Sequence, residues 1–302
     1  MALASVADDV LSQALARIAR EVDQGFDLLL PVPQDGRARL IEAMRYATIG
    51  GGKRIRPLLL TATAEMYGAS REAALRVGLA IEAIHAYSLI HDDLPCMDDD
   101  ALRHGKPTVH CAFDEATAVL AGDALHAFAF EVLADPVTSG DPFTRIELVS
   151  TLGLASGAAG MAGGQMMDIV AEGETFDLQA ITRLQQLKTG ALLGAAVEMG
   201  AILGRVPIEG RAHLRGFARD IGLAFQIADD LLDHEGNEDA AGKALRKDAV
   251  AGKQTFVSLL GADRARDQAQ ALVDQAIAHL HQHGAEADLL RALARYIVER
   301  DR

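Results

Sequence analysis

The sequence predicts an all-α protein, a single domain over residues 1–302 built as a bundle of about ten or more helices. Two long segments, 70–91 and 177–203, carry apolar residues at helical spacing. No stretch shows the alternation of β-branched residues that is typical of strands. All eight prolines lie at or before Pro207, most of them between such segments, and no linker or fixed repeat divides the chain.

Two helix starts follow from residue type. Ser70 and Asp177 directly precede apolar helical patterns, so both are predicted N-caps. The amino-terminal 21 residues form an amphipathic helix pattern without the basic start and apolar run of a signal peptide.

Composition restricts the class of protein. Half of the residues are hydrophobic, aromatic residues make up 4% and tryptophan is absent, so the predicted core is aliphatic. The formal net charge of -14 argues against nucleic acid and anionic lipid as partners. Two cysteines, Cys96 and Cys111, form no disulfide framework, and we expect a reducing, cytoplasmic location.

One stretch has the length of a membrane span. Residues 148–167 carry no charge, but they include five glycines and end beside Gln165. We interpret this stretch as one buried helix whose glycines allow close helix approach, and we expect no membrane span.

Two acidic segments indicate a metal-dependent site. Asp92 and Asp98 lie roughly 240° apart on a straight helix, so they converge only if the helix breaks at Pro95. Asp229 and Asp233 are four residues apart and share a helix face. Such open carboxylate sets suit magnesium, which retains waters and bridges to substrate phosphates. The alternatives are solvated helix ends or, for His91-Asp92, a metal phosphohydrolase, which requires more upstream histidines than His85.

Cations are placed to meet a phosphate. The segment GGKRIRP presents Lys53, Arg54 and Arg56 in a glycine-rich turn before a helix, which favours anion binding. It is not a nucleotide P-loop, because no GxxxxGK[ST] pattern precedes a strand. Lys188-Thr189 interrupts an apolar helix. The remaining candidate cations are Arg103, Lys106, Lys188, Lys243, Lys247 and Lys253.

These motifs in order, GGKRIRP, DDLPCMD, GMAGGQMMD, LKTG, FQIADDLLD and GKQTFVSLLG, resemble those of the short-chain trans-prenyl diphosphate synthases, with the bacterial farnesyl diphosphate synthases as the nearest group. The resemblance covers roughly residues 40–262. It implies a helical bundle around a deep central cavity, a homodimer, about three Mg²⁺ ions, and condensation of dimethylallyl or geranyl diphosphate with isopentenyl diphosphate.

The resemblance also implies residue roles. Asp92, Asp98 and Asp229 would bind magnesium, with Asp93 and Asp233 as the outer members of their motifs. The allylic diphosphate would meet Arg103, Lys188 and Lys243, and the isopentenyl diphosphate Gly52, Lys53, Arg56 and His85. Lys253 is a further substrate-binding position. Gln165, Asp168, Thr189 and Gln226 would line the cavity near the reacting carbons, with Lys188, Thr189 and Gln226 in catalytic roles.

Two features of the sequence bear on specificity. The family usually has a second arginine where this chain has His104, which would leave a partly charged group near isopentenyl diphosphate. Tyr87 and Ser88 lie five and four residues before Asp92. In the family that the chain resembles, a bulky aromatic residue at the position of Tyr87, with the insertion seen here as Pro95-Cys96, goes with a fifteen-carbon product, so the resemblance implies that Tyr87 is the cavity floor.

Other functions remain alternatives. A terpene cyclase has no use for GGKRIRP and lines its cavity with aromatic residues. A non-catalytic prenyl synthase subunit tends to lose one acidic motif, and both are intact here. Among enzymes, a geranyl or geranylgeranyl diphosphate synthase is the nearest alternative. The chemistry needs no side-chain base, and we take Cys96 and Cys111 as packing or bystander residues.

Overall fold

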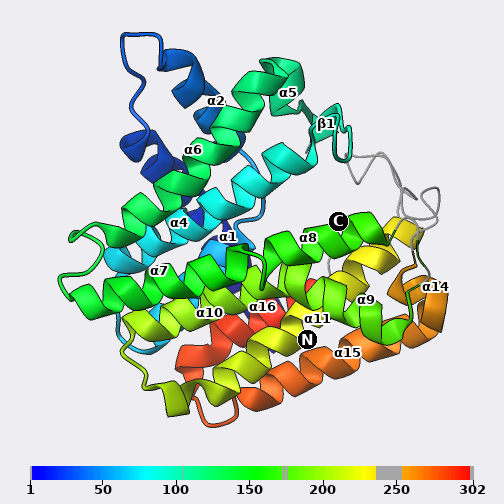
Figure 1. Ribbon diagram of the computed structural model, residues 1–302. Coiled ribbons are helices and arrows are strands. Elements are labelled where there is room, and N and C mark those ends of the chain that lie inside the picture. The colour runs from blue at the N-terminus through cyan, green and yellow to red at the C-terminus, as the bar shows by residue number, and fades with distance from the viewer. Residues whose placement is uncertain (1, 104, 172–173, 175, 236–253, 300–302) are drawn as a thin grey trace.

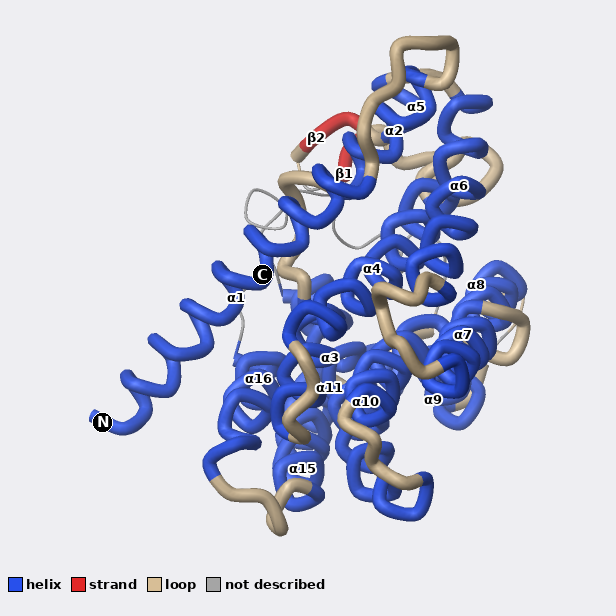
Figure 2. The backbone as a smooth tube through the Cα atoms, turned by 90° about the vertical axis from the view of Figure 1, so that its left-hand side faces the viewer, coloured by secondary structure: helices blue, strands red, loops and turns tan. Residues whose placement is uncertain are grey.

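The described chain folds almost entirely into helices, as Figures 1 and 2 show for this computed structural model. The structure describes residues 2–103, 105–171, 174, 176–235 and 254–299. The first half contains α1 (Ala2–Leu29), α2 (Ala38–Thr48), α3 (Ile55–Met66), α4 (Arg71–Asp92), β1 (Leu102–Arg103), β2 (Lys106–Pro107), α5 (Val109–Ala112), α6 (Glu115–Ala134) and α7 (Pro142–Ser156). The all-α prediction is confirmed, and β1 and β2 form one short antiparallel hairpin.

The second half follows with α8 (Met161–Val170), α9 (Leu178–Gln185), the π-helical turn η1 (Gln186–Gly190), α10 (Ala191–Leu203), the 3₁₀ turn η2 (Ile208–Arg211), α11 (Ala212–Glu235), α14 (Phe256–Leu260), α15 (Ala262–His279), the 3₁₀ turn η3 (Ala285–Ala287) and α16 (Asp288–Glu299). In Figure 2 the amino-terminal end of α1 projects from the bundle.

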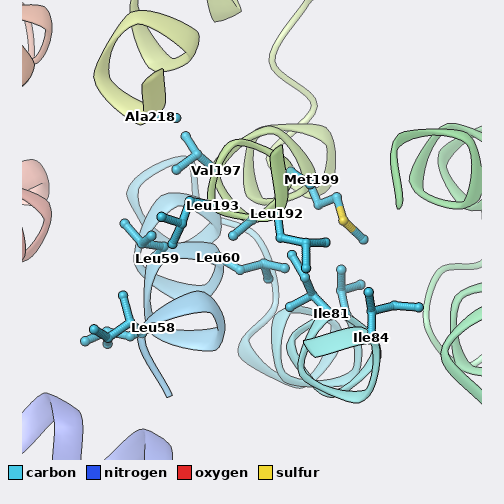
Figure 3. Close-up of a cluster of buried hydrophobic side chains, with 14 of the residues drawn as sticks. Leu58, Leu59, Leu60, Ile81, Ile84, Leu192, Leu193, Val197, Met199 and Ala218 are labelled. Atoms are coloured by element: carbon cyan, nitrogen blue, oxygen red, sulfur yellow. The ribbon is translucent and has the colours of Figure 1, made fainter. Parts of the chain in front are cut away.

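The core is aliphatic, as the composition predicts. Figure 3 shows leucine and isoleucine side chains from α3, α4 and α10 meeting at its centre. Leu59 and Leu60 of α3, Ile81 and Ile84 of α4, and Leu192 of α10 are at most 1% exposed. Because α4 contacts α1, α2, α3, α6 and α10, its side chains are buried on most sides. Its carboxyl end, which carries the first acidic motif, is therefore fixed by the core.

Several helix starts are set by their caps. Asp177 accepts a hydrogen bond from the Ala180 amide and confirms the predicted N-cap of α9. Ser70 occupies the N-cap position of α4, but its side chain makes no capping hydrogen bond. Asp114 and Asp141 cap α6 and α7 in the same way as Asp177.

The interpretation of residues 148–167 as one buried helix is wrong. α7 ends at Ser156 and α8 begins at Met161, so Gly157 and Gly160 cap two separate helices. A Cβ at Gly160 would lie 2.1 Å from the Ala155 carbonyl oxygen, a separation that only glycine allows. Leu154 and Met166 are 64% and 56% exposed.

By length and composition alone, three described helical stretches are apolar enough to cross a membrane. They are α4, α6 and the stretch Pro142–Val170, with 61%, 44% and 33% of their apolar windows buried. Burial against five neighbouring helices accounts for the hydropathy of α4, and the turn at Gly157–Gly160 interrupts the third stretch.

Candidate active site

A cavity of about 340 Å³ lies among α3, α4, α8 and η1. Its walls include eight of the residues predicted to form the site, and apolar side chains complete them. The lining residues are Arg56, His85, Tyr87, Ser88, Leu89, His91, Asp92, Met97, Met161, Ala162, Gln165, Met166, Ile169, Lys188 and Thr189. Residues more than 130 positions apart in the sequence therefore face one space.

The first acidic motif stands at one end of this cavity. α4 ends at Asp92, and the chain turns through Pro95 so that the Asp98 amide donates a 2.8 Å hydrogen bond to the Asp92 carbonyl. The predicted break is confirmed, and it returns the backbone of Asp98 to that of Asp92.

The two adjacent aspartates of this motif have different environments. Burial raises the pKa of Asp92 to about 6, with Asp98 and Asp93 adding to the shift and Lys188 and Arg103 opposing it. Asp93 is 3% exposed, and its carboxylate accepts hydrogen bonds from Arg103 at 2.8 and 3.0 Å. Arg103 also lies 3.8 Å from Asp100. Its guanidinium thus binds the acidic loop and opposes the burial that raises the pKa of Asp93 as well, whereas Asp92 lines the cavity.

The second acidic motif lies within the last turns of α11. Asp230 is 8% exposed and accepts a 2.8 Å hydrogen bond from the Phe256 amide, so it anchors the start of α14. Burial lowers the pKa of Arg56, and the charges of Glu82 and then Asp229 oppose that shift. Asp229 is therefore within electrostatic range of the cavity residue Arg56.

The carboxylates fit magnesium. Among the described residues, no group of three or more histidine, cysteine, aspartate or glutamate side chains could hold a metal ion by itself. Magnesium usually takes one or two carboxylates and completes its shell with waters and substrate phosphates. A cation beside Asp92 would relieve the repulsion and desolvation that raise its pKa. The donor set of Asp92, Asp98 and Asp229 therefore suits an ion held jointly with a phosphate-bearing ligand.

The turn before α3 supplies cations. Gly50 and Gly52 have φ of 76° and 77°, and Arg54 has φ of 53°, which turns the chain into the helix. The Arg56 Nε is buried without a hydrogen-bond partner in the structure. Lys53 is exposed, with its Nζ 6.0 Å from the centre of the Tyr296 ring. A buried donor without a partner at Arg56 is the strongest indication of an anionic ligand.

Arg54 does not belong with Lys53 and Arg56, contrary to the sequence prediction. Its side chain is 4% exposed and binds Glu82 at 2.7 Å and Asp23 at 2.9 Å. The buried Glu82 and the half-buried Asp23 neutralise its charge, so its guanidinium fixes the turn, although its Nε, like that of Arg56, is buried without a hydrogen-bond partner.

α8 and η1 form the opposite wall. Lys188 Nζ lies 2.8 Å from Asp168 Oδ2, which is one turn beyond the cavity residue Gln165 on α8. Both polar atoms of the Gln165 amide are buried without a partner in the structure. The predicted interruption at Lys188-Thr189 corresponds to the π-helical turn η1, a distortion often found at functional sites.

Aromatic rings close the cavity near Tyr87. This half-buried ring packs edge-on against His91 and His126, with centroids 5.7 and 5.1 Å apart. Ser88 donates a 2.9 Å hydrogen bond to the His85 carbonyl. Burial, followed by the charge of Asp92, raises the pKa of Tyr87, which therefore stays protonated at neutral pH.

Some predicted residues do not line this cavity. Gly52, Lys53, Asp98, Arg103, Gln226 and Asp229 lie outside its lining, and Gln226 is 9% exposed within α11. His104, Lys243 and Lys253 lie outside the described residues. Cys96 and Cys111 are both exposed, so neither packs in the core.

The sequence reasoning missed the apolar wall of α8. Met161, Ala162, Met166 and Ile169 line the cavity beside Gln165, the one α8 residue of this wall that was predicted. Their i, i+4, i+8 spacing was visible in the sequence, but the interpretation of one longer buried helix assigned that face to the core.

The fold and this site define a class of helical proteins in which paired carboxylates and buried cations flank an apolar cavity. The family model described as "Polyprenyl synthetase" matches residues 37–296, and the chain belongs to this family.

Named relatives agree with the family. The chain is 42% identical over 299 residues to "Farnesyl diphosphate synthase" of Escherichia coli K12, covering 96% of this chain and 99% of the relative. It is 59% identical to a solved apo "FPP/GFPP synthase" from Zymomonas mobilis, with a TM-score of 0.90 and coverage of 96% and 100%. A geranyltransferase from Helicobacter pylori, solved with magnesium and isoprenyl diphosphate, is 32% identical, with a TM-score of 0.80 and coverage of 95% and 96%.

Proposed function

We propose that the protein is a magnesium-dependent prenyltransferase that condenses dimethylallyl and geranyl diphosphate with isopentenyl diphosphate to give farnesyl diphosphate. The observation that carries this proposal is the cavity itself. Asp92, Arg56 and Lys188 line it from three different elements, and its remaining walls are largely apolar. The names of the Escherichia coli and Zymomonas mobilis relatives support the same reaction.

The proposal assigns each substrate to one set of residues. Asp92, Asp98 and Asp229 hold about three Mg²⁺ ions together with the allylic diphosphate, and Arg103, Lys188 and Lys243 bind that diphosphate. Gly52, Lys53, Arg56 and His85 bind isopentenyl diphosphate, and His104 and Lys253, which lie outside the described residues, are further substrate-binding positions. The buried Nε of Arg56 supports this second site, because a phosphate oxygen would satisfy it.

The residues of the chain act by binding, by orientation and by exclusion of water. When bound, magnesium supplies positive charge that stabilises the departing diphosphate. Lys188 Nζ, now on Asp168, adds a hydrogen bond to the leaving oxygen. The apolar wall of Met161, Met166 and Ile169 keeps water from the allylic cation.

Bond changes then balance without a side-chain base. The allylic C–O bond breaks, and the double bond of isopentenyl diphosphate forms the new C–C bond. One proton leaves to the released diphosphate. The Thr189 hydroxyl at the cavity wall and the Gln226 amide, which is buried in α11, provide dipoles that stabilise the cation.

The product length rests on Tyr87. Its ring lines the cavity one turn before Asp92 and is held by His91 and His126. We propose that a farnesyl tail stops there. Because the Zymomonas mobilis relative is named for both FPP and GFPP, longer products are the competing outcome.

We further propose a homodimeric, cytoplasmic protein with a single domain. Phe143 and Ile146 of α7 are 82% and 68% exposed, and Leu120 of α6 is 56% exposed. A second copy packed on these helices would bury these side chains. Light scattering of the purified protein tests the dimer, since a monomer at micromolar concentration would contradict it.

The test of the function is a direct assay. Purified protein with magnesium, geranyl diphosphate and isopentenyl diphosphate should release diphosphate and yield farnesol after dephosphorylation and chromatography. No diphosphate release would favour a non-catalytic subunit instead. If geranylgeraniol is the main alcohol, the protein is still a prenyltransferase, but its product is geranylgeranyl diphosphate.

A further inference from the structure

The turn that carries Lys188 and Thr189 requires an explanation, because the helices on both sides of it are regular. η1 is a π-helical turn between α9 and α10, so its backbone departs from the α-helical hydrogen-bond pattern. Lys188 and Thr189 line the 340 Å³ cavity. Figure 1 shows α8, α9 and α11 close together in this part of the bundle, and both α8 and α11 contact the turn.

α8 touches the turn backbone to backbone. A Cβ placed at Gly164 would lie 2.2 Å from the Lys188 amide nitrogen, 2.6 Å from its Cα and 2.8 Å from the Leu187 carbonyl carbon. Asp168 follows Gly164 by one helical turn and therefore lies on the same face. Its carboxylate is 2.8 Å from Lys188 Nζ. α8 thus holds Lys188 at both its backbone and the end of its side chain.

α11 approaches the turn at a second glycine. A Cβ at Gly222 would lie 3.3 Å from the Gly190 Cα and 3.9 Å from Leu193 Cδ1. Gly222 is buried in α11, one turn before Gln226 on the same helix. The turn is therefore in close contact with glycine at Lys188 and again at Gly190.

We propose that Gly164 and Gly222 are positioning residues that clamp η1 between α8 and α11 and so place Lys188 and Thr189 for ionisation of the allylic substrate. The proposal rests on the proposed function for its chemistry. A methyl group at position 164 cannot be accommodated by a side-chain rotation, because the atoms it meets belong to the backbone of the turn. The turn must move, and Lys188 moves with it.

The expected kinetic signature separates positioning from a general defect. Displacement of a reacting group by about 1 Å can cost about a hundredfold in rate, so Gly164→Ala should lower kcat by about that factor. The KM for isopentenyl diphosphate should stay within about threefold, because Arg56 stands on α3, whereas the atoms nearest to a Cβ at Gly164 or Gly222 belong to η1 and α10. Gly222→Ala should lower kcat by about tenfold, since its Cβ contact requires a smaller shift.

The chain offers two matched controls on α10. A Cβ at Gly200 would lie 2.6 Å from the Leu60 carbonyl oxygen, so Gly200→Ala is also overpacked against backbone, but against α3 instead of the turn. A Cβ at Gly194 would meet nothing within 4 Å. Gly200→Ala should lower the thermal midpoint and keep kcat per folded molecule, and Gly194→Ala should change neither.

The experiment is steady-state kinetics of the four full-length variants with magnesium, normalised to the folded fraction from circular dichroism. A kcat loss in Gly164→Ala and Gly222→Ala that Gly200→Ala does not share supports the clamp. Wild-type kcat in Gly164→Ala, or a loss that only follows stability as in Gly200→Ala, overturns it. If Gly164→Ala does not fold, Gly222→Ala decides alone: unchanged kcat there overturns the clamp. An inactive wild-type protein instead overturns the proposed function.

Discussion

The two acidic segments look alike in sequence and differ in structure. The first ends α4 and folds back at Pro95, so that the Asp98 amide reaches the Asp92 carbonyl. The second continues as regular helix in α11. In each segment one aspartate of the adjacent pair serves the fold. Asp93 binds Arg103, and Asp230 accepts from the Phe256 amide.

The charge of the other member of each pair acts on groups of the candidate site. Asp92 is desolvated beside like charges, and Asp229 is within electrostatic range of the buried Arg56. In each adjacent pair, one carboxylate has a described role in the fold, and its neighbour is a proposed magnesium ligand. Substitutions within each pair test this division.

The largest effect is expected at the cavity-facing members. Asp92→Asn and Asp229→Asn each remove a proposed magnesium ligand, and the loss should cost about 3–4 kcal/mol of activation, a hundredfold or more in kcat. The fold should be retained, because asparagine keeps the size and shape of aspartate and its side-chain amide can still form hydrogen bonds. Unchanged turnover at saturating magnesium would refute the ligand assignment.

The structural members should show the opposite pattern. Asp230→Ala leaves the buried Phe256 amide without its acceptor, which should lower the free energy of unfolding by about 1–3 kcal/mol. Urea denaturation measures this, with Asp229→Asn as the matched neighbour. If Asp230→Ala is as stable as the wild type and loses activity instead, the division of roles within the pair is wrong.

The free energy of unfolding should also depend on pH through the protonation of Asp92. Its folded pKa of about 6 lies above the unfolded value of 3.8, so the folded state binds the proton more tightly. This stabilisation is complete below pH 3.8 and is lost as pH rises through 6. In EDTA, Asp92→Asn should therefore gain about 1–2 kcal/mol over the wild type at pH 7.5, and much less at pH 4.5.

Glu198 provides a control of opposite sign. Its bonds to Arg215 and Arg211 outweigh burial and lower its pKa below the usual 4.5. Its stabilisation is present above pH 4.5 and is lost as pH falls through its folded pKa, so Glu198→Gln should be less stable than the wild type at pH 7.5. Equal pH profiles for Asp92→Asn and the wild type would contradict the desolvation of Asp92.

Local features of the fold were predictable from the sequence, and long-range contacts were not. The Asp177 cap and the break at Pro95 depend on neighbouring residues alone. The turn at Gly157–Gly160 depends on a close approach to the Ala155 carbonyl, which a hydrophobic pattern does not reveal. The apolar pattern of residues 148–167 is the same whether they form one helix or two.

The candidate site shows the same limit. Arg54 and Arg56 are two residues apart and equivalent as sequence, but Arg54 forms ion pairs with Asp23 and Glu82, whereas Arg56 lines the cavity. Asp229 and Asp230 differ because Phe256, 26 residues away, pairs with one of them. Lys188-Thr189 was visible as a polar pair in an apolar helix, whereas the π-helical widening depends on the approach of Gly164.

Substitutions one turn before the acidic motifs should have the smallest effect on turnover, and the one before the first motif should change the product. Tyr87 precedes Asp92 by five residues and lines the cavity, whereas Phe225, four residues before Asp229, does not. Removing the Tyr87 ring in Tyr87→Ala opens space beside His126 for a longer tail. Each added prenyl unit buries apolar area there at about 25 cal/mol per Å². Chromatography of the dephosphorylated products should show a shift from farnesol to geranylgeraniol, with the first condensation largely intact.

Tyr87→Phe keeps the ring and should keep farnesol, and Phe225→Ala should not change the product length. An active Tyr87→Ala variant that still stops at fifteen carbons would show that the tail ends elsewhere, and a product shift in Phe225→Ala would show that both acidic helices border the tail.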